Sequence, residues 1–129
     1  MAPSVVVAGG GTAGHIEPAL AVGEVLRDAH NANVVALGTE RGLETSIVPA
    51  RGFELRLIDP VPIPRSKPWL LAGVPFKLNK SVSQTRRILK DTGAQAVFGT
   101  GGYVAAPAYL AARSLGIPFY VLETNALAG

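Results

Sequence analysis

A glycine-rich segment near the start of the chain has the residue types and spacing of a loop that holds a phosphate group. It reads Gly9-Gly10-Gly11-Thr12-Ala13-Gly14-His15 and follows the short β-branched run 4–8. Glycine lets a backbone turn sharply and approach a ligand closely, and the start of a helix presents free N–H groups and a positive dipole end. The segment therefore predicts a binding loop for a phosphorylated ligand, placed between a buried strand and a helix.

His15 ends this segment at the predicted start of the helix. An imidazole can act as a general base, or polarise a hydroxyl group, near neutral pH. A single histidine can equally be a structural residue. Because His15 directly follows a predicted phosphate loop, we favour a role in the site, either as the base or as the group that polarises a substrate hydroxyl.

Two further polar segments follow predicted strands. Gly99-Thr100-Gly101-Gly102-Tyr103 is predicted to be a second glycine turn, and the segment 123–129 contains Asn125. Asn125 can donate and accept hydrogen bonds, which suits a sugar hydroxyl, but it can also cap a helix. The side chain of Tyr103 either lines a ligand-binding cleft or packs against other side chains of the protein. Since ligands of open α/β sheets bind at the carboxyl ends of the strands, the three segments predict one shared cleft.

Apolar runs and helical periodicity alternate along the whole chain. Strands are predicted at 4–8, 33–37, 53–58, 96–98 and 118–122, and helices at 18–29, 40–50, 76–92 and 104–115. Prolines at positions 60, 62, 64, 68 and 75 exclude regular helix or central strand between the third strand and the third helix. The alternation predicts a Rossmann-like α/β fold with a doubly wound parallel sheet and right-handed crossovers.

The first glycine segment also fits a dinucleotide-binding fingerprint. Gly9, Gly11 and Gly14 satisfy G-x-G-x-x-G, and Glu40 is placed to bind a ribose. The alternative is therefore an NAD(P)- or FAD-binding Rossmann domain of an oxidoreductase. The second glycine segment and His15 argue against it, because a dinucleotide fold has little use for either.

The amino-acid composition excludes several kinds of site and several classes of protein. The 129 residues contain no cysteine, which excludes disulfides and thiolate metal sites, and we predict no metal site and no required cofactor. No secretory leader is visible, and no apolar run reaches the roughly 20 residues that cross a bilayer. We therefore expect a soluble protein, or one that binds a membrane surface.

The positive charge is concentrated in one region. Residues 65–90 contain seven basic side chains and no acidic one, whereas all nine acidic residues lie elsewhere. Cations beside apolar side chains suit an anionic membrane surface, where each basic residue is worth about 1 kcal/mol. The alternative is a loop that packs its aromatic rings under a solvated basic helix. Nucleic acid is not predicted, since no stacking aromatics are interleaved with the cations. The predicted membrane patch comprises Arg65, Lys67, Trp69, Leu70, Leu71, Phe76, Lys77 and Lys80.

The chain resembles the MurG family of bacterial peptidoglycan N-acetylglucosaminyltransferases at several motifs in order. Residues 10–19, GGTAGHIEPA, are similar to the first glycine loop of that family, residues 101–107 to its second loop, and residues 123–129 to its Glu-x-Asn-x-x-Ala-Gly segment. Shorter similar stretches are Leu37-Gly38-Thr39, Leu43-Glu44 and Val48-Pro49. Several motifs at the correct spacing are far more specific than one glycine fingerprint.

The resemblance implies a fold, a reaction and a set of site residues. The family has a GT-B fold of two Rossmann-like domains, and it transfers GlcNAc from UDP-GlcNAc, with inversion, to the muramyl C4 hydroxyl of undecaprenyl-linked lipid I, giving lipid II. Thr12, Ala13, Gly14 and Asn125 would contact the sugar nucleotide, and His15 would lie near the acceptor. The family usually has glycine at position 13, and the methyl group of Ala13 restricts φ there. The implied substrate-binding set also includes Gly10, Gly11, Gly101, Gly102 and Tyr103.

The resemblance also implies what this chain supplies. Residues 1–129 correspond to the N-terminal acceptor-binding domain, incomplete at its C-terminal end, and the donor domain is absent. We expect this chain alone to be inactive, and the complete enzyme to be peripheral on the cytoplasmic face of the bacterial plasma membrane. Two alternatives are the acceptor subunit of a split lipid-linked-sugar GlcNAc transferase and a non-catalytic membrane-recruitment module.

Overall fold

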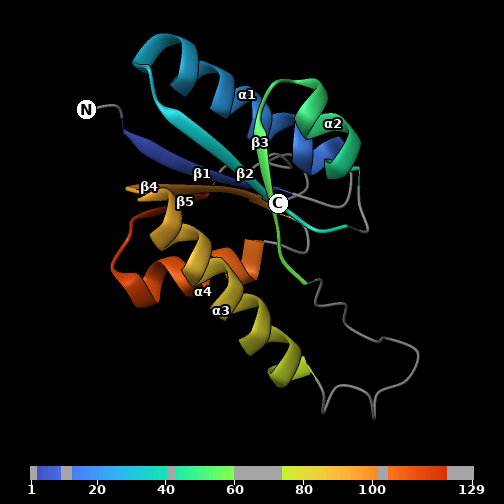
Figure 1. Ribbon diagram of the computed structural model, residues 1–129, viewed down its shortest axis with the longest axis vertical. Helices are drawn as coiled ribbons and strands as arrows, with labels where there is room; N and C mark the ends of the chain where they lie inside the picture. Colours follow the sequence, from blue (N-terminus) through green and yellow to red (C-terminus); the bar gives the residue numbers. More distant parts are fainter. Residues whose placement is uncertain (1–2, 10–12, 41–42, 60–73, 102–104, 122–129) are drawn as a thin grey trace, which may run out of the picture.

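Five parallel strands form a single sheet in this chain (Figure 1). The computed structural model describes residues 3–9, 13–40, 43–59, 74–101 and 105–121. The sheet has the order β3-β2-β1-β4-β5, in which every neighbouring pair is parallel. This order confirms the predicted doubly wound architecture, and the predicted third strand lies at an edge. The strands are β1 (Ser4–Gly9), β2 (Asn33–Gly38), β3 (Glu54–Leu57), β4 (Ala96–Gly101) and β5 (Phe119–Val121).

Helices cover both faces of the sheet (Figure 1). On one face lie α1 (Ala13–His30) and α2 (Glu44–Ala50), and on the other lie α3 (Val74–Thr92) and α4 (Ala105–Leu115). Side chains alternate across β1, so that Val7 packs with the first pair of helices, and Val6 and Ala8 with the second pair. The central strands are buried on both sides, which explains their unbroken apolar sequences.

Three helix starts differ from the prediction by two residues or more: α2 begins at Glu44, four residues after the predicted start, whereas α1 and α3 begin earlier than predicted. Helix α1 begins at Ala13, five residues before the predicted start, so that Pro18 lies inside the helix rather than at its beginning. Helix α3 begins at Val74 and carries Pro75 in its first turn, where the missing N–H group has no helical partner to lose. The helical spacing of Leu78, Val82, Thr85 and Leu89 in the sequence predicts one apolar stripe, with Lys80 and Arg87 roughly opposite. The structure confirms this stripe, since Thr85 and Leu89 are buried, Leu78 and Val82 are half-buried, and Lys80 and Arg87 are exposed.

Candidate functional site

The carboxyl ends of β1 and β4 lie side by side at the centre of the sheet. Gly9 at the end of β1 pairs with Gly101 at the end of β4, after a register shift between Ala8 and Gly9. From β1 the chain continues to β2 on one side, whereas β4 is followed by β5 on the other side. This point is the topological switch of the sheet, where ligands of open α/β folds bind.

Helix α1 starts only four residues after the end of β1, and its first turn contains the backbone of Ala13, Gly14 and His15. Gly14 is exposed, and this turn carries no acidic side chain. The N–H groups of a first turn have no intrahelical partner and favour an anion. The described part of the first glycine segment therefore supplies a helix start suited to phosphate. Gly10, Gly11, Thr12 and the side chains of Ala13 and His15 lie outside the described residues.

The second glycine segment is not the turn that we predicted after residue 98. Strand β4 continues through Gly99 and Thr100 to Gly101. A Cβ atom on Gly99 would lie 2.5 Å from Cζ of Phe119, a residue of the neighbouring strand β5. The missing side chain at Gly99 thus makes room for an aromatic ring, not for a ligand. Gly102, Tyr103 and Asn125 lie outside the described residues.

A buried carboxylate that the sequence did not single out follows β2. The side chain of Glu44 is fully buried at the start of α2, and its Oε2 accepts hydrogen bonds from the Thr39 backbone N–H at 2.8 Å and from the Thr39 hydroxyl at 3.4 Å. Glu40, the acid of the dinucleotide alternative, is exposed. Glu44 fixes the connection that leaves the carboxyl end of β2. The signal that could have identified it is its place in the short Leu43-Glu44 similarity.

Asp59 is held against α3 at the point where the proline-rich stretch begins. Its backbone N–H donates to Oε1 of Gln84 at 2.7 Å, and its carbonyl accepts from the Ser81 hydroxyl at 2.6 Å. Its carboxylate pairs with Lys80 at 2.8 Å. The hydrogen bonds from Lys80 and Gln84 lower the pKa of Asp59, and the pair raises the pKa of Lys80. Lys80, predicted to face a membrane, therefore has a carboxylate partner within the protein.

The exposed side of α3 is strongly basic. Arg86, Arg87 and Lys90 line a surface hollow of about 340 Å³ together with Ser83 and Asp91. Within the described ranges none of these three cations forms an ion pair. Lys77, one turn before Lys80, is also exposed. The side chain of Phe76 lies outside the described residues. So do the other residues of the predicted membrane patch, namely Arg65, Lys67, Trp69, Leu70 and Leu71.

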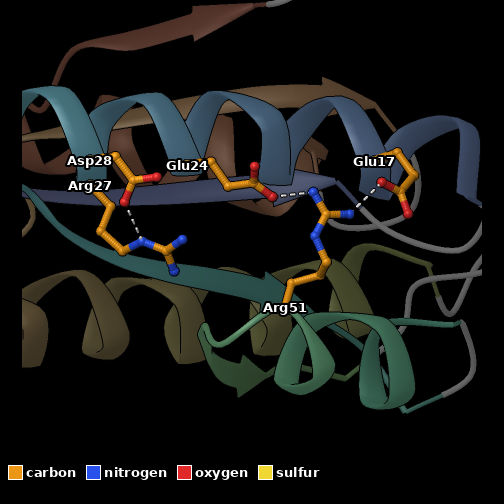
Figure 2. Close-up of polar contacts among 5 residues, drawn as sticks. All are labelled: Glu17, Glu24, Arg27, Asp28 and Arg51. Atoms are coloured by element: carbon orange, nitrogen blue, oxygen red, sulfur yellow. Dashed lines mark hydrogen bonds and ion pairs between the residues drawn. The ribbon is translucent and has the colours of Figure 1, made fainter.

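Arginine contacts link α2 to α1 on the other face of the sheet. Figure 2 shows Arg51, just after α2, between Glu17 and Glu24 of α1. The guanidinium of Arg27 lies 4.5 Å from the ring centre of the buried Phe53. These contacts join residues far apart in the sequence, and sequence analysis identified none of them.

Two kinds of feature are absent from the described residues, and both absences concern the predicted classes of protein. Among residues 3–9, 13–40, 43–59, 74–101 and 105–121, no group of three or more His, Cys, Asp or Glu side chains could hold a metal ion. In the same part of the chain, no helix has both the length and the apolar character that a membrane span requires.

Residues 5–129 match the model of the glycosyltransferase family 28 N-terminal domain. The chain belongs to this family. It is 70% identical over 126 residues to the UDP-N-acetylglucosamine--N-acetylmuramyl-(pentapeptide) pyrophosphoryl-undecaprenol N-acetylglucosamine transferase of Corynebacterium efficiens, covering 98% of this chain and 35% of that protein. The transferase of the same name from Streptomyces coelicolor is 56% identical over 126 residues, and the match covers 97% of this chain and 35% of that protein. This chain therefore spans about a third of the length of the curated relatives it matches.

Solved structures agree with the family assignment. The crystal structure of Acinetobacter baumannii MurG superposes with a TM-score of 0.78 at 35% identity, covering 97% of this chain and 38% of that one. The Streptomyces glycosyltransferase SsfS6, complexed with thymidine diphosphate, has a TM-score of 0.67 at 15% identity. The match covers 92% of this chain and 38% of that one, and at this identity it shows the fold alone. The predicted GT-B N-terminal architecture is confirmed, and the comparisons give no support to the oxidoreductase alternative.

Proposed function

We propose that this chain is the acceptor-side half of an inverting glycosyltransferase of peptidoglycan biosynthesis. The complete enzyme transfers GlcNAc from UDP-GlcNAc to the muramyl C4 hydroxyl of undecaprenyl-linked lipid I and forms lipid II. The observation that carries this proposal is the 70% identity to a relative whose name states this transfer, within a matched glycosyltransferase domain. The helix start at the topological switch supports it, because both substrates carry a diphosphate.

The proposed reaction is a direct displacement at the anomeric carbon of GlcNAc. The acceptor oxygen forms the new bond to that carbon while the bond to the diphosphate breaks, and UDP leaves with the electron pair. A base takes the proton of the acceptor hydroxyl. His15 is the candidate for this base in our chain, and an acidic residue of the donor domain is an equal one. Backbone N–H groups at the start of α1 bind the diphosphate of one substrate.

The substrate-binding residues proposed here come from the family's motifs. Thr12, Ala13, Gly14 and Asn125 contact the sugar nucleotide. The other proposed members of the substrate-binding set are Gly10, Gly11, Gly101, Gly102 and Tyr103. No metal is proposed, and UDP-GlcNAc enters as the donor substrate through the part of the enzyme that this chain does not contain.

The test is transfer by the complete enzyme. This chain is joined to the donor domain of a close relative, and transfer of radiolabelled GlcNAc from UDP-GlcNAc to a lipid I analogue is measured. We expect lipid II formation by the joined protein and none by residues 1–129 alone. Binding of NADH in calorimetry, without transfer by the joined protein, would favour the oxidoreductase alternative.

We also propose that the basic side of α3 binds an anionic membrane surface, on the cytoplasmic face of the plasma membrane where lipid I is presented. The exposed Lys77 supports an attraction to lipid phosphates, together with Arg86, Arg87 and Lys90, which form no ion pair within the described part of the chain. Lys80 contributes beside them, next to Asp59. The proposed patch also includes these residues predicted from the sequence: Arg65, Lys67, Trp69, Leu70, Leu71 and Phe76.

Neutralising one cation of this surface is expected to weaken membrane binding about fivefold. One basic residue near an anionic surface is worth about 1 kcal/mol, which corresponds to this factor. The measurement is co-sedimentation of Arg87→Gln with vesicles containing phosphatidylglycerol. Arg27→Gln is the matched control, because it removes the same charge from α1 on the opposite face of the sheet (Figure 1). Equal weakening by both substitutions, or none by Arg87→Gln, would contradict the proposal.

A further inference from the structure

Arg51 is held at a fixed place where α2 ends. Its backbone N–H donates to the carbonyl of Ile47 at 3.1 Å and to that of Val48 at 3.2 Å. Gly52 then adopts a φ of 84°, a left-handed conformation that favours glycine, and closes the helix by donating to the Pro49 carbonyl. This helix end fixes the backbone from which the Arg51 side chain reaches α1 (Figure 2).

The Arg51 side chain contacts α1 at two points. Its Nη1 lies 2.7 Å from Oε2 of Glu17, and its Nη2 pairs with Oε1 of Glu24. Glu17 and Glu24 are seven residues apart, which places them on the same face two turns apart. The hydrogen bonds that Arg51 donates to Glu24 and Glu17 raise the pKa of Arg51. We name these two contacts the Arg51 bridge.

The Arg51 bridge spans a weak point of α1. Pro18 lies between the two carboxylates, and it has no backbone N–H to donate to the carbonyl of Gly14. The segment 13–17, which comprises the first turn and Glu17 directly after it, is therefore attached to the rest of the helix by fewer hydrogen bonds than an ordinary helix start. Glu17 belongs to that segment, whereas Glu24 belongs to the continuous part after Pro18. Arg51 holds both parts at once.

The middle of α1 is independently fixed against the sheet. A Cβ atom on Gly23 would lie 3.1 Å from Cγ1 of Val34 and 3.2 Å from Cε1 of Phe53, so the helix approaches β2 closely at this position. Arg27 covers the ring of Phe53 from the next turn. The part of α1 after Pro18 is thus a rigid base, and the Arg51 bridge connects the first turn to it.

We propose that Arg51 is a positioning residue for the phosphate-facing first turn of α1. The proposal rests on the proposed function, in which this turn binds the diphosphate of UDP-GlcNAc or of lipid I. The positive charge of Arg51 also favours anion binding at this turn. Its partner Glu17 lies about 6 Å along the axis from the start of α1, within the Debye length of about 8 Å, so an unpaired Glu17 would repel the anion. By pairing with Glu17, Arg51 offsets the negative charge of α1 that lies nearest to the helix start.

The test compares Arg51→Gln, Glu17→Gln and the double variant in the complete transferase. We expect Arg51→Gln to raise the KM for one diphosphate substrate about 3- to 10-fold, with kcat nearly unchanged. Glu17→Gln is expected to raise the same KM by less, because it breaks the bridge but also removes the negative charge nearest the helix start. The double variant is expected to be no worse than Arg51→Gln, because both changes remove the same contact. The substrate whose KM rises, UDP-GlcNAc or the lipid I analogue, identifies the diphosphate that the turn holds.

Arg56→Gln is the matched control, since Arg56 pairs with Glu54 within its own strand. It should leave both KM values unchanged. A second readout needs no activity: amide hydrogen exchange in a peptide covering residues 13–20 should be faster in Arg51→Gln and unchanged in Arg56→Gln. If wild-type enzyme fails to transfer but exchange behaves in this way, the proposed function is wrong and the positioning role stands. Unchanged exchange, unchanged KM values, or additive effects of the two substitutions would overturn the inference.

Discussion

Replacing Gly38 by alanine is expected to destabilise the protein by about 1–3 kcal/mol, the usual range for an overpacked core. A Cβ atom at this position would lie 2.7 Å from Cγ and 2.9 Å from Cβ of Glu44. Glu44 cannot easily yield, because its side chain is fully buried and its carboxylate accepts the Thr39 N–H at 2.8 Å. Relieving the contact would break that bond or shift the end of β2.

Gly23→Ala is the matched control for this effect. It adds the same methyl group to α1, where the nearest atoms are side-chain ends of Val34 and Phe53 at 3.1 and 3.2 Å. Alanine also gains up to about 1 kcal/mol over glycine inside a helix, which offsets the tighter packing. Thermal unfolding should therefore show a clear decrease in Tm for Gly38→Ala and a small change for Gly23→Ala. Equal melting temperatures would show that the Gly38–Glu44 contact relaxes at no cost.

The architecture was predictable because burial in a doubly wound sheet leaves a direct trace in the sequence. The run Val5-Val6-Val7-Ala8 is apolar throughout, as expected of a strand covered on both faces. Apolar and charged residues alternate over 53–58, a pattern that predicts a strand near a sheet edge, and β3 lies at the edge. The inward stripe of α3 was visible from its spacing alone. Each of these patterns is local in the sequence, and each has the same cause, the burial of apolar side chains.

The role of individual glycines was less predictable because it depends on distant neighbours. Gly99 was interpreted as part of a ligand turn, but its open side is filled by Phe119, twenty positions further along the chain. Gly38 was noted only as part of a similarity, yet it makes room for the buried Glu44. Composition cannot tell a glycine that admits a ligand from one that admits another side chain.

The charged contacts around α1 escaped sequence analysis for the same reason. Arg51 and Glu17 are 34 positions apart, and no periodicity joins them. Their proximity follows from the short α2, which returns the chain to β3 and brings its last turn beside α1. The predicted start of α1 at residue 18 was wrong because proline is best tolerated in the first turn of a helix, which favours a helix that begins at Pro18. The correct start at Ala13 is what makes the Arg51 bridge span a proline.

Replacing His15 by alanine is expected to lower kcat of the complete transferase about 100- to 10,000-fold, the range for removal of a general base. The backbone of His15 lies in the first turn of α1, at the helix start beside the carboxyl end of β1. A base in this position would take the proton of the acceptor hydroxyl while the diphosphate is held by the N–H groups of the same turn. A residue that only supports the fold would instead lower Tm.

His30→Ala is the matched control for His15→Ala. It removes the other histidine of the chain, an exposed residue at the C-terminal end of the same helix, and should leave kcat unchanged. A base must be unprotonated to accept a proton, so kcat/KM of the wild type should fall toward acidic pH as the imidazole becomes charged. That decline should be absent from the residual activity of His15→Ala. Full activity in His15→Ala, with the acidic decline intact, would assign the base to the donor domain and leave α1 with phosphate binding alone.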